Sequence, residues 1–263
     1  MKVIITGAAG GLGRAFVNEC VKRGYEVFAT DINLYGLKLI QEGIYARYGK
    51  KINIIETDIR SDQSVGALFQ EMKNKQFKPD LLLNVAGIDY EGRFSLRPFS
   101  ELQKIIEINV IGTMRMIHSF IDADQDNKHR YIINIASLAA EQPIPLKATY
   151  AASKRFLIHF GSGIREELKT NNIHLLSVCP AGLATNPEVI KAIHAQGFFG
   201  AISTCHIEQV VSRSIDYCLQ GKKKYVPGGF NQLTVILNKF IPTSLTTKIL
   251  YKRWNKAQKL WLK

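Results

Sequence analysis

The chain has 263 residues, of which 46% are hydrophobic and 22% are charged. This composition is typical of a globular protein, and it excludes a disordered chain, a fibre and a disulfide-stabilised miniprotein. The net charge of +13 lies mainly near the C-terminus, because residues 217–263 contain ten lysines and arginines and no acidic residue. Such a charge indicates attraction to anionic lipid or nucleic acid, and it does not constrain the fold.

The four cysteines form no C-x-x-C pair, and no histidine accompanies them at zinc-finger spacing. We therefore expect free thiols in a reducing compartment and no metal site. The sequence shows no secretory signal and no run of about 20 apolar residues that could cross a membrane. These features favour a cytoplasmic protein.

Short apolar segments alternate with helical patterns along the chain. The expected strands are residues 3–6, 25–30, 52–56, 81–85, 131–136, 173–178 and 224–226. The expected helices are residues 12–22, 36–48, 62–75, 100–120, 150–169 and 207–219. This alternation predicts an α/β fold, a single-domain doubly wound (Rossmann) parallel sheet of about seven strands with helices on both faces. Ligands bind such sheets at the carboxyl ends of the strands.

The segment T-G-A-A-G-G-L-G, residues 6–13, lies between the first strand and the first helix. Glycines at this position allow a pyrophosphate to approach the helix N-terminus. An acidic residue, Asp31, ends the second strand, where a carboxylate can bind the ribose hydroxyls of adenosine. The spacing is not G-x-G-x-x-G, because position 16 is Phe16. The motif alone therefore leaves a dinucleotide site and an ordinary turn open.

Tyr150 and Lys154 are four residues apart on an expected helix, so they share one face. A lysine cation there can lower the pKa of a phenol, which can then exchange a proton with a carbonyl or alcohol oxygen. The alternative is an uncoupled tyrosine and lysine at the surface. Ser137 ends the fifth strand, where its hydroxyl could polarise the same substrate oxygen or cap the next turn. Asn109 lies within a long helix, where it could orient a water molecule or bond to its own helix.

In this order and spacing, the motifs resemble those of the short-chain dehydrogenase/reductase family over nearly the whole chain. The family's N-N-A-G reads Asn84-Val85-Ala86-Gly87 here, and its P-G-x-x-x-T loop reads Pro180-Ala181-Gly182-Leu183-Ala184-Thr185. The resemblance implies cofactor contacts at Thr6, Gly7, Gly11, Leu12, Gly13, Asp31, Asp58, Ile59, Asn84, Ala86, Gly87, Tyr150, Lys154, Pro180, Gly182 and Thr185. The alanine beside Pro180 puts the local backbone of its loop in question.

The resemblance also implies a reaction, the transfer of a hydride between nicotinamide C4 and a carbonyl or secondary-alcohol carbon. In that reaction Tyr150 is the general acid or base, and Lys154 lowers its pKa and binds the nicotinamide ribose. Ser137 holds the substrate oxygen, and Asn109 anchors a water molecule between Lys154 and solvent. The carboxylate of Asp31 favours NAD(H) over NADP(H), because it repels a 2′-phosphate.

Residues 88–94, 138–146 and 183–205 are expected to line or cover the substrate pocket. Ile193, and the pair Phe198 and Phe199 between two glycines, outline a mobile apolar lid. They favour an apolar carbonyl or alcohol substrate. The same residues could instead pack in the core or between subunits.

A basic amphipathic helix is expected over residues 243–263, after a cofactor-binding and catalytic domain at residues 1–242. Leu250, Trp254, Ala257 and Trp261 fall on one face of this helix, nearly opposite Lys248, Lys252, Lys256, Lys259 and Lys263. The helix could lie on an anionic membrane, or it could pack on its own or a neighbouring subunit. No motif for specific nucleic-acid binding accompanies the charge.

The family resemblance further implies a homo-oligomer, dimer or tetramer, formed through helices near residues 100–120 and 150–169. A second interpretation of the chain is a nucleotide-binding sensor or scaffold on the same fold, with a peripheral membrane role as a third. The complete set of Asn109, Ser137, Tyr150 and Lys154 favours an enzyme. An epimerase or dehydratase would be expected to have a longer C-terminal region and different glycine spacing.

Overall fold

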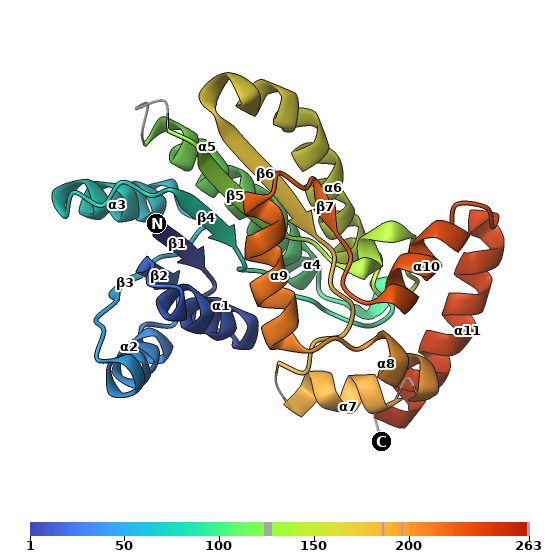
Figure 1. Ribbon diagram of the computed structural model, residues 1–263. Helices are drawn as coiled ribbons and strands as arrows, with labels where there is room; N and C mark the ends of the chain where they lie inside the picture. The colour runs from blue at the N-terminus through green and yellow to red at the C-terminus, as the bar shows by residue number, and fades with distance from the viewer. Residues whose placement is uncertain (124–127, 186, 196, 262–263) are drawn as a thin grey trace.

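A seven-stranded parallel sheet forms the centre of the protein, in the strand order β3-β2-β1-β4-β5-β6-β7 (Figure 1). The computed structural model describes residues 1–123, 128–185, 187–195 and 197–261, without the side chains of 187–189, 192, 198, 199 and 256–261. The strands are β1 (Lys2–Thr6), β2 (Glu26–Asp31), β3 (Asn53–Glu56), β4 (Leu81–Asn84), β5 (Arg130–Ile135), β6 (Ile173–Val178) and β7 (Lys224–Tyr225). The predicted doubly wound sheet is confirmed.

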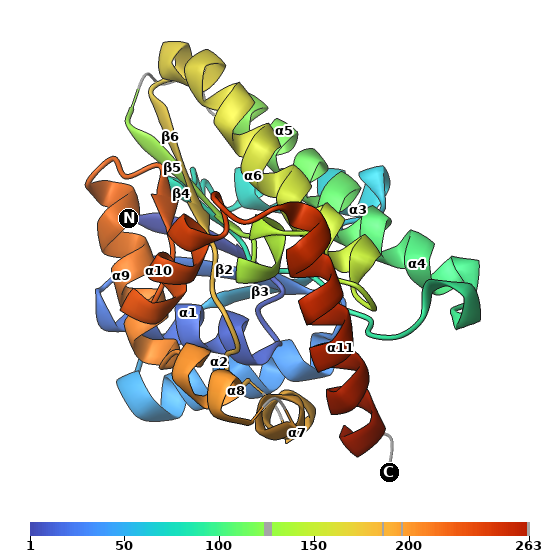
Figure 2. The same cartoon turned by 90° about the vertical axis from the view of Figure 1, so that its right-hand side faces the viewer.

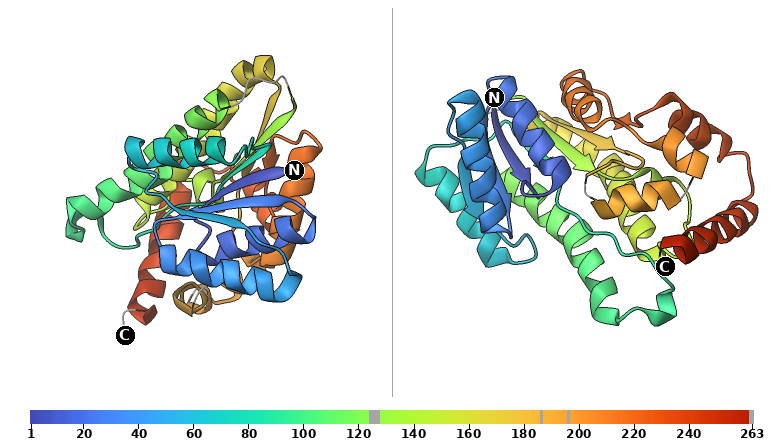
Figure 3. Two further views of the ribbon diagram at one scale, coloured as in Figure 1. Left: turned by 90° about the vertical axis from the view of Figure 1, so that its left-hand side faces the viewer. Right: turned by 90° about the horizontal axis from the view of Figure 1, so that it is seen from below.

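Helices cover both faces of this sheet, and Figure 3 shows α1 and α2 on one side and α3 to α5 on the other. The longer helices are α1 (Gly11–Lys22), α2 (Leu34–Tyr48), α3 (Asp62–Asn74), α4 (Phe99–Ile106), α5 (Thr113–Asp122), α6 (Ala148–Leu168), α9 (Ile207–Leu219) and α11 (Thr243–Trp261). Shorter helical segments are η1 (Phe94–Leu96), η3 (Leu138–Glu141), η4 (Lys169–Asn171), α7 (Pro187–Ala195), α8 (Gly197–Ser203) and α10 (Gly229–Leu237).

The helix expected over residues 100–120 is divided into three consecutive helical segments. A π-helical turn, η2 (Glu107–Gly112), separates α4 from α5. Such turns widen a helix by one residue and occur frequently at functional sites. Here the wide turn contains Asn109, whose side chain bonds to a neighbouring loop and not to its own helix.

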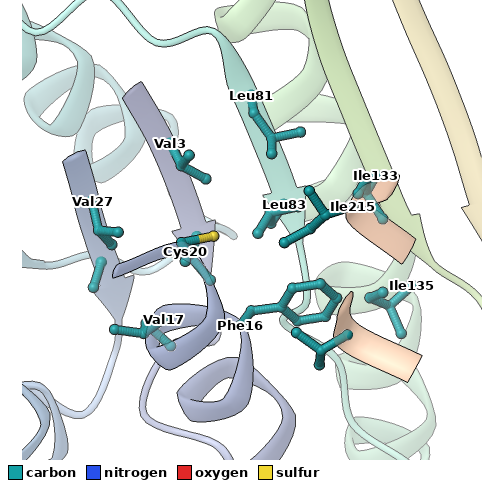
Figure 4. Packing of buried hydrophobic residues seen from close by; sticks show 14 of the residues in the cluster. Val3, Phe16, Val17, Cys20, Val27, Leu81, Leu83, Ile133, Ile135 and Ile215 are labelled. Atoms are coloured by element: carbon teal, nitrogen blue, oxygen red, sulfur yellow. The ribbon is translucent and has the colours of Figure 1, made fainter. Parts of the chain in front are cut away.

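Successive residues of β1 point to opposite faces of the sheet, and both faces are buried. Val3 and Ile5 pack with α1 and α9, whereas Ile4 packs with residues of α3 and α5. Figure 4 shows Phe16 and Val17 of α1 packed near Val3 and other strand residues on the α1 side of the sheet. Burial on both faces explains why the strands appear in the sequence as continuous apolar runs.

The chain reverses its direction of progress through the sheet between β1 and β4, which are neighbours on either side of the topological switch point. The loops that follow β1, β2, β4, β5 and β6 therefore meet at one edge, where α7, α8, α10 and α11 are added. Figure 2 shows α11 running along this side, and it packs against α7. Within the described residues, no helix combines the length and the apolar character that a membrane span requires.

Candidate active site

The loop after β1 has a backbone that only glycine permits. Gly7 has a φ of 65°, and a Cβ on Gly13 would lie 2.1 Å from the Gly7 carbonyl oxygen. The Thr6 hydroxyl accepts hydrogen bonds from the backbone N–H groups of Val85 and Ala86, at 3.1 and 3.2 Å. Thr6 therefore fixes the distance between the loop after β1 and the loop after β4.

The N-terminus of α1 opens onto the same edge of the sheet. No side chain caps it, and its first turn contains no acidic residue. A Cβ on Gly11 would lie 2.6 Å from the Thr185 carbonyl oxygen, so the loop after β6 approaches this helix closely. Free N–H groups at a helix N-terminus suit the phosphates of a dinucleotide.

Two carboxylates follow β2 and β3. Asp31 accepts hydrogen bonds from the backbone N–H groups of Ala9 at 3.0 Å and Asn33 at 2.9 Å. Asp58 forms an ion pair with Arg60 at 2.7 Å, and hydrogen bonding from this guanidinium holds the pKa of Asp58 below its usual value. Arg60 lines the cavity but was not among the residues that the motifs identified. Its position two residues after Asp58 could have indicated an ion pair with that carboxylate.

Tyr150, Ser137 and Lys154 lie together beyond the end of β5. The side chain of Ser137 lies near the phenol of Tyr150 and acts to lower its pKa, and the Ser137 hydroxyl accepts from the backbone N–H of Ala139 at 3.1 Å. Ser137 thus caps the next turn and also reaches the phenol. Lys154 donates to the Ile135 carbonyl at 2.8 Å, and its Nζ lies 5.9 Å from the centroid of the Tyr150 ring.

Asn109 is buried next to Lys154 and binds the loop after β4 and the helix α6. Its amide nitrogen donates to the Ile88 carbonyl at 2.9 Å and to Ser153 Oγ at 3.0 Å, and its Oδ1 accepts from the Ile88 N–H at 2.9 Å. A Cβ on Gly87 would lie 3.0 Å from Lys154 Nζ and 3.1 Å from Asn109 Oδ1. The side chain of Asn109 therefore holds the loop after β4 against Lys154.

Burial has the largest effect on the protonation of these groups. It raises the pKa of Tyr150 to about 12, with the Asp89 carboxylate adding to the rise, while Ser137 and Lys147 act in the opposite direction. Burial also lowers the pKa of Lys154 to about 8. Desolvation therefore outweighs the effect of nearby cations on the pKa of Tyr150. The expected lowering of this pKa by Lys154 stays a prediction.

A partly exposed ion cluster beside Tyr150 was not anticipated. Lys147 Nζ lies 2.5 Å from Asp89 and 3.3 Å from Glu91, and it lies 5.7 Å from the centroid of the Tyr150 ring. Burial lowers the pKa of Lys147, but the two carboxylates more than offset this effect and raise it overall. The sequence signal for this residue was its place one helical turn before Tyr150.

These groups surround one cavity of about 920 Å³ at the carboxyl edge of the sheet. All of the predicted site residues line it except Thr6, Asn84 and Asn109, which are buried and support its wall. Ile193 also lines the cavity, whereas the side chains of Phe198 and Phe199 lie outside the described residues. The segment expected to form a lid is largely helical, as α7 and α8.

The C-terminal helices close the far side of the cavity. Its lining includes Phe230, Asn231 and Thr234 of α10 together with Leu250 and Trp254 of α11. Lys147 Nζ lies 4.9 Å from the centroid of a Trp254 ring. The predicted apolar face of the last helix therefore packs inward at Leu250 and Trp254, while Ala257 and Trp261 have no described side chains.

The residues present fit a nicotinamide dinucleotide. The glycine turn leaves no space for a side chain at Gly13, the N-terminus of α1 supplies uncapped N–H groups, and the carboxylate of Asp31 is fixed beside them. Lys154 lines the same cavity. No group of three potential metal ligands occurs in the part of the chain that is described.

The family model for short chain dehydrogenases matches residues 1–192. The chain belongs to the short chain dehydrogenase family. It is an oxidoreductase of this family, whose members act on carbonyl or alcohol groups with NAD(P).

Individual relatives are distant. Ketoacyl reductase HetN of Nostoc sp. is 26% identical over 239 residues, which is 91% of this chain and 82% of HetN. The protein named Probable oxidoreductase EphD of Mycobacterium tuberculosis is 27% identical over 196 residues, but the chain spans only 33% of EphD. A short chain dehydrogenase/reductase from Burkholderia phymatum in complex with NAD has the same fold, with a TM-score of 0.78 and 20% identity over 90% of this chain and 92% of that one.

Proposed function

We propose that the protein interconverts a carbonyl compound and a secondary alcohol with NAD(H), and that Tyr150 is the acid or base. The observation that supports this most strongly is that Ser137, Tyr150 and Lys154 line the same cavity as the glycine turn. A bound nicotinamide would supply the hydride acceptor or donor. The residues of the chain would bind it, orient the substrate and move one proton.

Each side chain has a distinct task in this proposal. The half-buried phenol of Tyr150, with its raised pKa, is neutral near pH 7 and would donate its proton to a carbonyl oxygen. Ser137 would hold the same oxygen through its hydroxyl. Lys154 would bind the nicotinamide ribose and favour the tyrosinate that forms. Asn109 would keep the loop at Gly87 in place, so that this arrangement is formed before substrate binds.

The carboxylate of Asp31 supports a preference for NAD(H). Each of its oxygens already accepts one backbone hydrogen bond and retains capacity for a ribose hydroxyl, whereas a 2′-phosphate would be repelled. Arg14 donates through Nε to the Ala9 carbonyl at 2.9 Å, and Arg60 is paired with Asp58. Neither cation is positioned to compensate for the charge of Asp31.

We infer an apolar carbonyl or alcohol substrate of small or medium size. Leu138, Ile144 and Leu183 line the cavity, with Trp254 opposite them. The similarity to a protein named as a ketoacyl reductase agrees with a substrate that has an apolar chain. The ion cluster around Lys147 adds a polar region at this end, where a second polar group of the substrate could bind.

We also infer a homo-oligomer, a dimer or tetramer, formed through α4, α5 and α6. Apolar side chains on α4 and on the segments before and after it are exposed in the single chain, at Phe94, Leu96, Phe99, Ile106 and Ile111. Such a group of exposed apolar residues is typical of an interface. The four cysteines are free thiols, which supports a reducing compartment such as the cytoplasm.

A panel of apolar ketones with NADH tests the proposal directly. We expect the wild-type protein to oxidise NADH with at least one ketone, and Ser137→Ala to reduce kcat by about a hundredfold or more. Fluorescence titration with NADH provides the control, because Ser137→Ala is expected to retain cofactor affinity. Binding of NADH without turnover of any ketone or alcohol in the panel would instead favour a nucleotide-binding sensor or scaffold.

A further inference from the structure

The corner formed by α10, α11 and the turn between them exposes an unusual number of large apolar side chains. We call this surface the C-terminal corner. Its members are Leu233, Ile236, Leu237, Phe240, Ile241, Leu245 and Ile249. Phe240, in the turn, is 81% exposed, which is the largest exposed fraction of any large hydrophobic residue among those described. Figure 1 shows this corner at the edge of the molecule, away from the sheet.

The inward faces of the same two helices already have a role. Phe230 and Thr234 of α10 line the cavity, as do Leu250 and Trp254 of α11. The C-terminal corner is therefore a second apolar surface on helices whose first apolar surface lines the cavity. Contiguous exposed apolar surface of this kind marks an interaction site more often than a solvated face.

Positive charge surrounds the C-terminal corner. Lys239, Lys248 and Lys252 are exposed beside its apolar residues. No acidic residue follows Asp216 in the sequence, so no carboxylate from this part of the chain neutralises them. The surface thus combines apolar side chains with unbalanced lysines, which is the combination that binds anionic lipid headgroups above an acyl layer.

This charge selects among the occupants that an apolar surface could have. A second copy of the chain would bring the same lysines against these lysines, and like charges oppose such contact. Nucleic acid would satisfy the lysines but would not bury Phe240 or Leu237. An anionic bilayer can both pair with the lysines and bury the exposed apolar side chains.

We propose that the C-terminal corner docks the protein on an anionic lipid bilayer. Phe240, Leu237 and their neighbours enter the boundary between headgroups and acyl chains, while Lys239 and Lys248 lie among the headgroups. Because α10 and α11 also line the cavity, docking places its wall next to the lipid. This goes beyond the oxidoreductase activity and does not depend on it.

Vesicle flotation with the full chain tests the proposal. We expect binding to vesicles of phosphatidylcholine with phosphatidylglycerol, and much weaker binding to phosphatidylcholine alone. Adjacent to an anionic surface each lysine contributes about fivefold in affinity. Lys239→Glu with Lys248→Glu should therefore reduce binding at least about 25-fold. The control, Lys38→Glu with Lys73→Glu, changes the net charge equally at exposed sites on α2 and α3.

The apolar contribution has its own pair of variants. Leu237→Ser with Phe240→Ser should reduce binding by about tenfold or more, because both side chains leave the lipid. Tyr35→Ser with Leu39→Ser is the matched control, since these exposed residues lie on α2. Circular dichroism and thermal unfolding of each variant verify the fold without reference to enzymatic activity.

Several results would overturn the proposal. One is the absence of binding to anionic vesicles. Another is an equal loss of binding in the corner variants and in their controls, which would show that only the net charge matters. Binding that depends on the lysines but not on Phe240 and Leu237 would also contradict it, because the corner would then not enter the lipid.

Discussion

Lys147→Met should raise the pKa of Tyr150, and the size of the effect follows from the structure. Lys147 Nζ lies 5.7 Å from the centroid of the Tyr150 ring. At an effective dielectric constant of about 20, a unit cation at this distance stabilises a phenolate by about 3 kcal/mol. Loss of the cation should therefore reduce the tyrosinate fraction at a fixed pH by about a hundredfold. The carboxylates of Asp89 and Glu91, left without their lysine, act in the same direction.

The assay is the pH dependence of kcat/KM for alcohol oxidation, which requires Tyr150 as a base. In Lys147→Met the rising limb of this profile should move to higher pH, and in Asp89→Asn it should move to lower pH, because the Asp89 carboxylate raises the pKa of Tyr150. Lys22→Met, at an exposed position on α1, is the matched control and should leave the profile unchanged. Identical profiles for the wild type and Lys147→Met would refute the reasoning.

Three further predictions concern the cofactor end of the cavity. Asp31→Ala should weaken NADH binding about tenfold or more and reduce the preference over NADPH, as fluorescence titration would show; unchanged affinities would contradict the role of the carboxylate. Gly13→Ala should lower the melting temperature by forcing a Cβ against a carbonyl oxygen, whereas Gly43→Ala, which has open space, should preserve or raise it; equal melting temperatures would contradict the packing argument. The Asp58–Arg60 ion pair lowers the pKa of Asp58, so it should add up to about 1 kcal/mol to the free energy of unfolding above pH 4. This stabilisation should be lost as the pH falls through the lowered pKa of Asp58. Acid unfolding of Arg60→Ala checks this, because the variant should lack the stabilisation.

The sheet could be predicted from the sequence because burial on both faces leaves a clear pattern. Residues 173–178 were expected as a strand and form β6 with the same bounds. The predicted start of the last helix at Thr243 also agrees with α11. Most of the residues that the motifs named line the cavity, since the motifs follow strands and parallel strands end at one edge.

Other features depend on contacts between distant parts of the chain. The π-helical turn at Asn109 is linked to hydrogen bonds with Ile88, which is 21 residues earlier. The ion pair of Lys147 with Asp89 joins residues 58 positions apart, and no local pattern announces it. The raised pKa of Tyr150 has the same origin, because the degree of burial is set by the assembled fold and not by the Y-x-x-x-K spacing.

Helix α10 was missed for a different reason. It is a short helix directly after Gly228, with apolar residues on both its exposed and its cavity-lining faces. A helix of this kind has no single apolar stripe, so the periodic pattern that identifies amphipathic helices is weak. The apolar face predicted for α11 agrees with the structure at Leu250 and Trp254, which line the cavity. The sequence alone could not show that this face lies toward the cavity.

The most direct test of the central claim is a comparison of Tyr150→Phe with the wild type, using NADH and a ketone that the wild type reduces. The phenol oxygen is the only group removed, and its ring continues to fill the cavity wall. The account predicts that NADH affinity is retained and that kcat falls by about a hundredfold to ten-thousandfold. Turnover equal to that of the wild type, with NADH still bound, would contradict it.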